Sequence, residues 1–463
     1  MKKGNLIVCT LVLILVSIFQ TFSIAQIIAA GGLHSLAVCG DNTVMAWGTN
    51  LNGQLGNGTN IASNIPMQVS SLTNIKAISA GDVHSLALKN DSTVWGWGEN
   101  FYGQLGNGTN SNTNIPVQVS SINNIIAISA GDYHSLALRN DSTVWAWGLN
   151  SYGELGNGTY NASNVPIHII ALTSITAIAA GEAHCLALKN DGTVWAWGWN
   201  SLGQLGNGTN TFSNIPLQVS SLSGIIAIAA GKQHNFALRN DGTVWAWGLN
   251  LDGQLGIGTN TSSNIPVQVT SLSGVTAIAA GLYHTVALKN DGTVQAWGTN
   301  GAGQLGNGNN NASNLPVQVT SLTGILAIAV GDHHSLALKN DGTIQAWGWN
   351  STGELGQGDT INSNIPLQVI NLCPMQTGVK ETTEHLFISI SPNPFSNFTT
   401  ITLPTTQQPA TIILTDILGK EIRTIPHVRD RQVVIEKGDM KPGIYFLTLT
   451  TQAGVENRKI VVE

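Results

Sequence analysis

The chain has 463 residues, of which 10% are charged and 52 are glycine, and its formal net charge is −6. This length exceeds one ordinary hydrophobic core, so a repeat architecture or several domains are expected. The net negative charge does not favour binding to nucleic acid, because proteins that bind nucleic acid depend on clustered lysine and arginine. After residue 25, no apolar stretch of the sequence is long enough to span a bilayer.

The first 25 residues are typical of a secretory signal peptide. Lys2 and Lys3 precede an apolar run over residues 6–19, and Ser23-Ile24-Ala25 is similar to a signal-peptidase site. We therefore expect residues 1–25 to be a signal peptide that is cleaved after Ala25. The mature chain then leaves the cytoplasm and enters a compartment where disulfides are permitted. An uncleaved membrane anchor is the alternative interpretation.

From residue 27 onward the sequence repeats with a period of 50 residues, without insertion or deletion. Seven tryptophans and seven prolines recur at intervals of 50 residues, beginning at Trp47 and Pro66. Fixed periods of this size are typical of solenoids and propellers. One histidine also recurs in every copy, and the set is His34, His84, His134, His184, His234, His284 and His334.

Each copy predicts four short strands. In the second copy, the pattern of apolar residues predicts strands at residues 75–80, 84–89, 93–98 and 115–119, which we call A, B, C and D. A tight turn over residues 90–92 joins B to C, and a glycine-rich loop over residues 99–114 joins C to D. Pro116 cannot donate a ladder hydrogen bond, so strand D belongs at a sheet edge. The copies predict an all-β protein whose residues 26–372 form a seven-bladed β-propeller of four-stranded blades.

The repeated pattern AAGxxHSLALxxDGTVWAWGxNxxGQLGxG, followed by a proline, resembles the repeat of the regulator of chromosome condensation family. The resemblance covers residues 27–372. It implies a seven-bladed propeller, in agreement with the count of copies. The family's namesake exchanges nucleotide through a loop that departs from the repeat, but no copy here contains an insertion. We therefore do not expect nucleotide-exchange activity.

The recurrent histidines have a metal-binding and a structural interpretation. Seven side chains, one in each blade, cannot converge on one ion at ligand distances, so we expect no metal site. Each histidine lies at the A–B turn, where a ring nitrogen can satisfy a backbone group. We therefore interpret all seven as structural residues, and we expect no cofactor.

Two cysteines are placed to close the predicted ring. Cys39 occupies the position of Lys89 at the end of strand B, and Cys373 occupies the position of Thr73 just ahead of strand A. Because an A–B hairpin brings these positions together, we predict a Cys39–Cys373 disulfide that joins the seventh blade to the first. Two free thiols are the alternative. Cys185 stands at a serine position and is expected to remain a thiol.

The last 78 residues, 386–463, form a different module. Alternating strands are predicted at residues 399–403, 411–415 and 445–450, which indicates a small immunoglobulin-like β-sandwich. The segments SISPNPF, DILGKEI, MKPGIYFLTL and RKIVVE occur in the order of a type A sorting domain of type IX secretion, which this module resembles. The resemblance implies a Gram-negative cell, export through the outer membrane by the type IX machinery, and later removal of the domain. An unrelated immunoglobulin-like module is the alternative, and residues 373–385 are the predicted linker.

Binding is the function that these features favour. Catalysis needs an asymmetric constellation, such as two carboxylates in different environments, and near-identical copies offer little asymmetry. No phosphate loop, nucleophile elbow or zinc-ligand spacing is present, so we predict that the protein is not an enzyme. We expect a secreted or surface-retained monomer that recognises a protein or a glycan. An extracellular hydrolase or lyase and a purely structural surface protein are the alternatives.

The copies differ most at the A–B turns and C–D loops, which the strand directions place on one face of the propeller. Tyrosine and tryptophan are preferred interface anchors, and the acids in these segments outnumber the lysines, which favours basic or neutral ligands. Sequence drift in loops that pack on one another is the alternative. The predicted partner-binding residues are Asp82, Glu99, Phe101, Tyr102, Asp132, Tyr133, Tyr152, Glu182, Trp199, Tyr283, Asp332 and Trp349.

Overall fold

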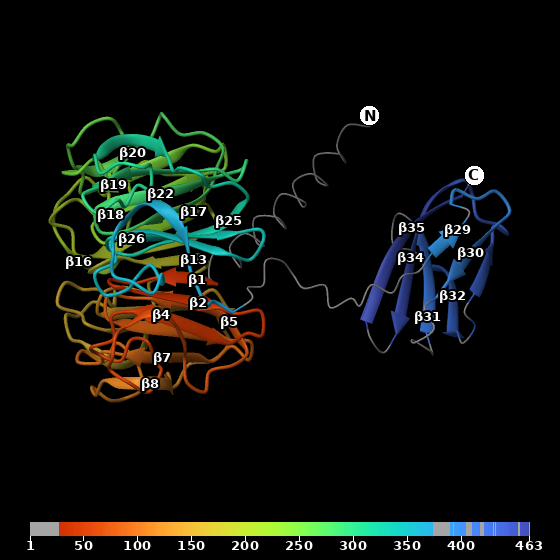
Figure 1. Cartoon of the computed structure of the whole chain (residues 1–463), viewed down its shortest axis with the longest axis horizontal. Helices are drawn as coiled ribbons and strands as arrows, with labels where there is room; N and C mark the ends of the chain where they lie inside the picture. The colour runs from red at the N-terminus through yellow and green to blue at the C-terminus, as the bar shows by residue number, and fades with distance from the viewer. Residues whose placement is uncertain are drawn as a thin grey trace. The chain divides into compact units, whose positions relative to one another are not determined.

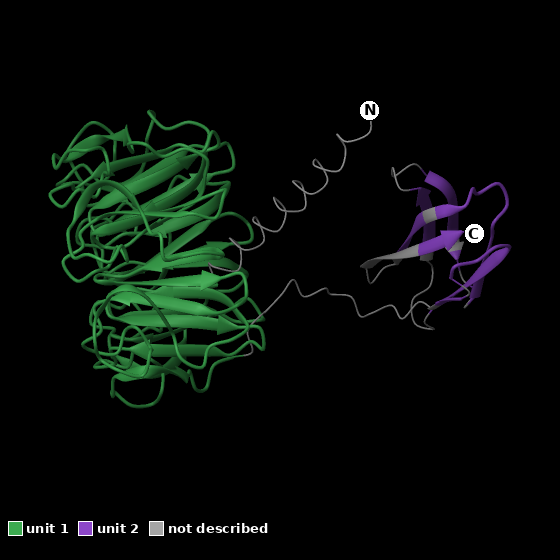
Figure 2. Ribbon diagram, turned by 90° about the horizontal axis from the view of Figure 1, so that it is seen from above, with its two compact units in different colours: residues 1–377 green, residues 378–463 purple. Residues whose placement is uncertain are grey.

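The structure is a computed structural model of the whole chain, and it describes residues 27–373, 389–391, 393–403, 410–416, 421–428, 430, 432–451 and 454–462. The chain divides into two compact units, residues 1–377 and residues 378–463 (Figure 2). The predicted signal peptide with its cleavage after Ala25, and residues 374–385 of the predicted linker, lie outside the described residues. Within the described residues, no helix is long and apolar enough to cross a membrane.

The described residues of the first unit form seven antiparallel four-stranded sheets, one for each sequence copy (Figure 1). Within each sheet the strands follow chain order, A-B-C-D. We number the sheets as blades 1 to 7. Their strands are β1 (Ile28–Ala30), β2 (His34–Val38), β3 (Val44–Gly48) and β4 (Ser63–Gln68); β5 (Ile75–Ala80), β6 (His84–Lys89), β7 (Val94–Gly98) and β8 (Thr113–Gln118); β9 (Ile125–Ala130), β10 (His134–Arg139), β11 (Val144–Gly148) and β12 (Ser163–His168); β13 (Ile175–Ala180), β14 (His184–Lys189), β15 (Val194–Gly198) and β16 (Ser213–Gln218); β17 (Ile225–Ala230), β18 (His234–Arg239), β19 (Val244–Gly248) and β20 (Ser263–Gln268); β21 (Val275–Ala280), β22 (His284–Lys289), β23 (Val294–Gly298) and β24 (Ser313–Gln318); and β25 (Ile325–Val330), β26 (His334–Lys339), β27 (Ile344–Gly348) and β28 (Ser363–Gln368).

The A strands surround the axis of the ring. Each A strand lies beside the A strand of the next blade, and β25 lies beside β1, so that the ring is closed. The D strands form the outer edge of each sheet, as Pro116 in β8 requires. The prediction of an all-β seven-bladed propeller is therefore confirmed.

The hydrophobic core of the propeller lies between the blades. The tryptophan that precedes the last glycine of each C strand, as Trp97 does in blade 2, is fully buried in all seven blades. Trp97 of blade 2 packs with Leu36, Val44 and Leu55 of blade 1, and its indole N–H donates to the carbonyl of Gln54 at 2.8 Å. Because each blade buries its apolar faces only against its neighbours, the ring is stable as a whole rather than blade by blade.

Glycines in the C–D loops allow adjacent blades to approach closely. Gly103 has a φ of +83°, and a Cβ atom at this position would lie 2.4 Å from the Cα of Asn164 in the next blade. Both the positive φ and the close contact exclude other residues. The amide of Gly108 also donates to the carbonyl of Asn164, at 2.9 Å, so each loop is tied to the following blade.

The ring closes between blade 7 and blade 1. Strand β1 has three residues, whereas strand A of blade 2 has six. A disulfide joins Cys39, which follows β2, to Cys373, with the two Cα atoms 5.7 Å apart. Leu372 and Cys373 pack against the hydrophobic cluster that the two blades share. Cys185 is a buried free thiol.

The described residues of the second unit form two sheets. One contains β29 (Ser389–Ser391), β30 (Phe398–Thr402) and β33 (Gln432–Glu436), and the other contains β31 (Ala410–Asp416), β32 (Glu421–Val428), β34 (Gly443–Thr451) and β35 (Gly454–Val462). Side chains from both sheets share one core, which includes Ile401, Ile435, Leu414 and Leu447. The predicted small β-sandwich is confirmed, with strand bounds that differ from the expected ones by a few residues.

Candidate binding face

The A–B turns meet around one end of the propeller axis. The amide of Glu182 donates to the carbonyl of Lys232 at 3.1 Å, and across the closing seam the amide of Asp332 donates to the carbonyl of Gly31 at 3.3 Å. A Cβ atom on Gly31 would lie 2.3 Å from the carbonyl oxygen of Gly81 in the next blade. The turns therefore form a tight collar in which only glycine fits at this position.

Lys232 holds three carboxylates together within the collar. Its Nζ atom lies 2.9 Å from Asp82, 3.1 Å from Asp132 and 2.8 Å from Asp332, and the four side chains come from four blades. Burial raises the pKa of Asp132 and Asp332, and the Lys232 ammonium opposes that rise. The cluster carries two more carboxylates than ammonium groups, so it remains anionic when all four groups are ionised.

The position of Asp132 corrects one expectation from the sequence. It was expected in a solvent-facing turn as a partner contact, but it is only 9% exposed and pairs with Lys232. Asp82 and Asp332 also form ion pairs with Lys232, although their side chains are less buried than that of Asp132. Glu182 accepts a hydrogen bond from the side-chain amide of Gln233 at 2.7 Å. The physical reason is that charges brought to the narrow axis lose water and must be paired.

Aromatic side chains from blades 2 to 4 contact one another across blade boundaries. The ring of Tyr102 lies 5.2 Å from that of Phe101 and 5.5 Å from that of Tyr133, measured between centroids. Tyr152 lies 6.1 Å from Trp199 and 5.4 Å from Phe212. We call this set the aromatic arc, and it consists of Phe101, Tyr102, Tyr133, Tyr152, Trp199 and Phe212.

Half of the aromatic arc is exposed to solvent and half is partly covered. Phe101 is 69% exposed, Phe212 is 42% exposed and Tyr152 is 39% exposed, whereas the other three rings are half-buried. Hydrogen bonds to buried side chains fix the backbone of these loops. In blade 2, the amide of Tyr102 donates to the side chain of Gln104 at 3.0 Å. The arc therefore presents apolar rings on a fixed backbone rather than on a free loop.

The remaining predicted aromatics lie outside the arc. Trp349 of blade 7 contacts His333, with centroids 6.2 Å apart, and donates to the hydroxyl of Ser351. Tyr283 of blade 6 occupies the same turn position as Tyr133 but has no aromatic contact among the described residues. The structure thus gathers the six residues of the arc into two groups of three, one at the junction of blades 2 and 3 and one at the junction of blades 3 and 4, and leaves Tyr283 and Trp349 apart.

An anionic group borders the arc at the junction of blades 2 and 3. The amide of Glu99 donates to the carbonyl of Val83 at 3.0 Å, which places Glu99 beside the turn that carries Asp82. Burial and the Asp82 charge raise the pKa of Glu99. Burial and the nearby carboxylates of Asp82, Asp132 and Glu99 raise the pKa of Tyr133 to about 12.

The seven histidines form a ring of hydrogen bonds between blades. The Nε2 atom of His84 lies 2.9 Å from the Ser135 hydroxyl, and His334 closes the ring with Ser35 at 2.8 Å. His134 meets the thiol of Cys185 at 3.1 Å. The expected backbone partner is therefore replaced by a side chain of the next blade. The described residues contain no group of histidine, cysteine or carboxylate side chains arranged to hold a metal ion.

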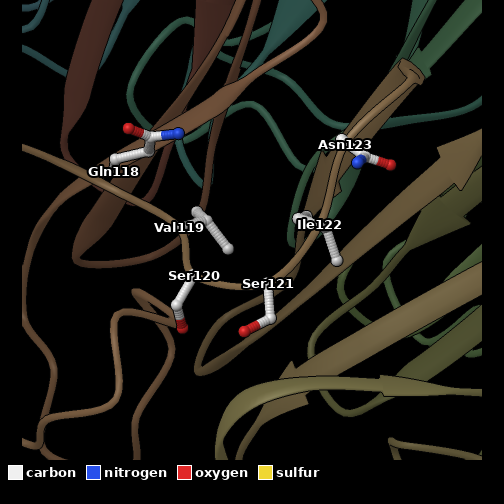
Figure 3. A pocket seen from close by; sticks show the side chains of 6 residues that line it. All are labelled: Gln118, Val119, Ser120, Ser121, Ile122 and Asn123. Atoms are coloured by element: carbon white, nitrogen blue, oxygen red, sulfur yellow. The ribbon is translucent and has the colours of Figure 1, made fainter.

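The opposite end of the propeller is closer to neutral. Lys189 lies over the ring of Trp195, with its Nζ atom 4.8 Å from the centroid, and similar pairs occur in blades 2, 3 and 5. An open pocket of about 460 Å³ is lined by six consecutive residues, Gln118 to Asn123, at the end of β8 and in the segment that leads to β9 (Figure 3). None of these residues is charged or aromatic, so this hollow offers no acid, base or aromatic anchor.

Seven four-stranded sheets arranged around an axis define a β-propeller. A model of the RCC1-like domain matches residues 120–386, and the chain belongs to this family. Models of the regulator of chromosome condensation (RCC1) repeat match residues 41–88, 91–138, 25–54 and 75–104. The model of the secretion system C-terminal sorting domain matches residues 389–463, which confirms the sorting domain.

Solved structures of eukaryotic propellers are similar to this chain. Prp20p from Saccharomyces cerevisiae, described with its binding properties to Gsp1p and histones, is 25% identical with a TM-score of 0.66, and the match covers 80% of this chain and 91% of that chain. Human WBSCR16 is 26% identical with a TM-score of 0.65, covering 71% of this chain and 93% of that chain. Yeast RCC1 (Prp20) bound to Kap60 is 23% identical with a TM-score of 0.66 and supports the fold alone. No curated protein matches the chain significantly.

The sorting domain indicates secretion or association with the outer membrane. It also implies the type IX secretion machinery as a partner during export.

Proposed function

We propose that the protein is an extracellular binding propeller that recognises a protein or glycan through the face formed by its A–B turns and C–D loops. In this proposal the signal peptide and the sorting domain serve export, and the propeller is the mature binding module. The observation that carries the proposal is the aromatic arc, which is exposed on blades 2 to 4 and has no counterpart on blades 5 and 6.

The arc has the properties of an interface centre. Tyrosine, tryptophan and phenylalanine bury large areas with little loss of side-chain entropy, and they dominate the energetics of many interfaces. A propeller supported by contacts between blades does not need exposed rings for its own core, because the buried tryptophans such as Trp147 already fill that role. The rings of the arc are therefore available to a partner.

The relatives support a binding function in general terms only. The structure of Prp20p is described with binding to Gsp1p and histones. These partners belong to Prp20p, and we do not transfer them. What we carry over is that a propeller of this family can act by binding other proteins.

Export is tested by the masses and locations of the products. We expect the mature secreted chain to lack residues 458–463, because the sorting domain is removed. Deletion of residues 386–463 should retain the propeller in the periplasm. Unimpaired export of the deletion variant would contradict the role of the C-terminal domain.

The binding face is tested on a partner captured from surface extracts and then purified. Trp199→Ala should weaken binding to that partner by about 2 kcal/mol or more, because a hot-spot aromatic is lost. Lys189→Ala, at the opposite end of the propeller, is the control and should leave binding unchanged. Equal binding by both variants, with folding intact by circular dichroism, would place the site elsewhere. Turnover in a screen of polysaccharides and esters would favour the hydrolase or lyase alternative.

A further inference from the structure

We infer that the end of the aromatic arc between blades 2 and 3 binds a lysine or arginine side chain of a polypeptide partner. We call this place the cation subsite, and it consists of Glu99, Phe101, Tyr102 and Tyr133. The inference rests on the proposed function and deepens it by naming the chemistry that the partner must present.

The cation subsite is assembled from segments far apart in the chain. Tyr102 comes from the C–D loop of blade 2 and Tyr133 from the A–B turn of blade 3, and their rings meet at 5.5 Å with an interplanar angle of 70°. Phe101 contacts Tyr102 from the other side, with an interplanar angle of 83°. Edge-to-face packing of this kind turns aromatic faces in different directions, so that a cation can lie over one ring beside a neighbouring ring.

The carboxylate of the subsite has no cationic partner among the residues that the structure describes. Glu99 forms no ion pair with any residue that the structure describes, whereas Asp82 is paired with Lys232. Lys232 is itself committed to three aspartates at 2.8–3.1 Å. A carboxylate that is partly removed from water gains more from an incoming cation than a fully exposed one does.

The charge of this region selects between classes of ligand. Glu99 and the anionic collar repel phosphate, sulfate and acidic polymers, so polyanions are disfavoured. A neutral glycan would stack on the rings but would not require the carboxylate. A basic polypeptide uses both features, because an ammonium or guanidinium group is attracted by aromatic faces and by Glu99 together.

The repeat supplies an internal comparison for the subsite. Tyr283 in blade 6 occupies the turn position of Tyr133, but the loop of blade 5 has Leu249 where blade 2 has Glu99, and Asp252 where blade 2 has Tyr102. Blade 6 therefore offers the same tyrosine without the aromatic neighbour. Asp252 offers a carboxylate on the same face, but at the position of Tyr102 rather than at that of Glu99.

The test measures binding of fluorescent oligolysine and oligoarginine peptides to the purified secreted protein by anisotropy. Acetylated oligolysine is the uncharged control peptide. Glu99→Gln and Tyr133→Ala should each weaken binding of the basic peptides by about tenfold or more, because the first removes the carboxylate and the second removes an aromatic ring that contacts the cation. Tyr133→Phe keeps the ring and should retain binding. Asp252→Asn and Tyr283→Ala remove the same charge and the same ring elsewhere on the face, and should change binding by less than about twofold.

Several results would overturn the inference. Equal weakening by Glu99→Gln and Asp252→Asn would mean that only the overall charge of the face attracts the peptide. Binding of a neutral oligosaccharide that is lost in Tyr133→Ala, without binding of basic peptides, would assign the arc to glycans. Loss of the captured partner in Trp199→Ala, together with unchanged peptide binding in Glu99→Gln, would overturn the cation subsite while leaving the proposed function intact.

Discussion

Blades 2 to 4 and blades 5 to 6 share one framework but display different surfaces. In both groups a buried asparagine organises the C–D loop: Asn100 accepts from the amide of Leu105 at 2.9 Å, and Asn250 accepts from the amide of Leu255 at 2.8 Å. The loop backbones are therefore held alike. Yet blade 2 presents Phe101 where blade 6 presents Gly301.

The difference shows which positions the fold constrains. The loop asparagine, the histidine and the fully buried tryptophan of each copy make hydrogen bonds or core contacts that the ring requires, and they recur in all seven copies. The loop tips make few such contacts, so that their residues vary: the positions of Phe101 and Tyr102 hold leucine and aspartate in blade 5 and glycine and alanine in blade 6. Variation on a constrained framework is where binding residues are expected.

Acidification should have the largest effect, because it acts on the framework in every blade. Burial lowers the pKa of His134 to about 3 and of His184 to about 4, against an ordinary value of 6.5. The unfolded chain therefore takes up protons as the pH falls below about 6.5 while the folded chain does not, and stability is lost from about pH 6.5 down to about pH 4 for His184 and about pH 3 for His134. Each histidine contributes on the order of 2 kcal/mol of this loss near pH 5.

Five carboxyl groups oppose that trend. Burial raises the pKa values of Glu99, Asp132, Glu154, Asp332 and Glu354, so the folded state binds protons first at these groups and is stabilised as the pH falls. Seven fully buried histidines outweigh these five carboxyl groups, so the net change should be a loss. Urea unfolding at a series of pH values measures it. If the free energy of unfolding does not change from about pH 7 to about pH 5, the histidines of the two groups of blades are not buried in the neutral form.

The framework tryptophans should be equally important in the two groups. Trp147 in blade 3 and Trp297 in blade 6 are fully buried, and each indole donates to a carbonyl of the preceding blade at 2.8 Å. Trp147→Ala and Trp297→Ala should each lower the free energy of unfolding by about 3–5 kcal/mol. Chemical denaturation measures both. Trp199→Ala, in the aromatic arc, is the control and should lower the free energy of unfolding much less. If the losses of stability in Trp147→Ala and Trp297→Ala differ severalfold, the blades are not equivalent.

The seam between blades 7 and 1 should depend on its covalent bond. Replacement of both Cys39 and Cys373 by serine should lower the free energy of unfolding by about 2–4 kcal/mol, because the bond closes a very long loop. Non-reducing peptide mapping should recover the two cysteines in one crosslinked peptide. Cys185→Ser, which restores the residue found in other blades, should change stability by less than about 1 kcal/mol. Recovery of Cys39 and Cys373 as free thiols from normally exported protein would contradict the prediction.

The sequence by itself determined the architecture of both units. The period of 50 residues, the alternation within each strand and the proline in strand D are local patterns, so they predicted the number of blades and the order of strands. The sorting domain was also predictable, because its motifs are contiguous segments of the chain. The sequence likewise indicated which turns and loops share a face, since this depends only on strand direction.

Only the tertiary structure decided which residues of that face meet. Lys232 pairs with Asp82 and Asp132, which lie 150 and 100 residues earlier, and Tyr102 meets Tyr133 across a blade boundary. These contacts depend on how far each side chain lies from the axis and how closely adjacent blades pack. The repeat pattern specifies the position of a residue within its blade, but the distance between blades follows from the closure of the whole ring.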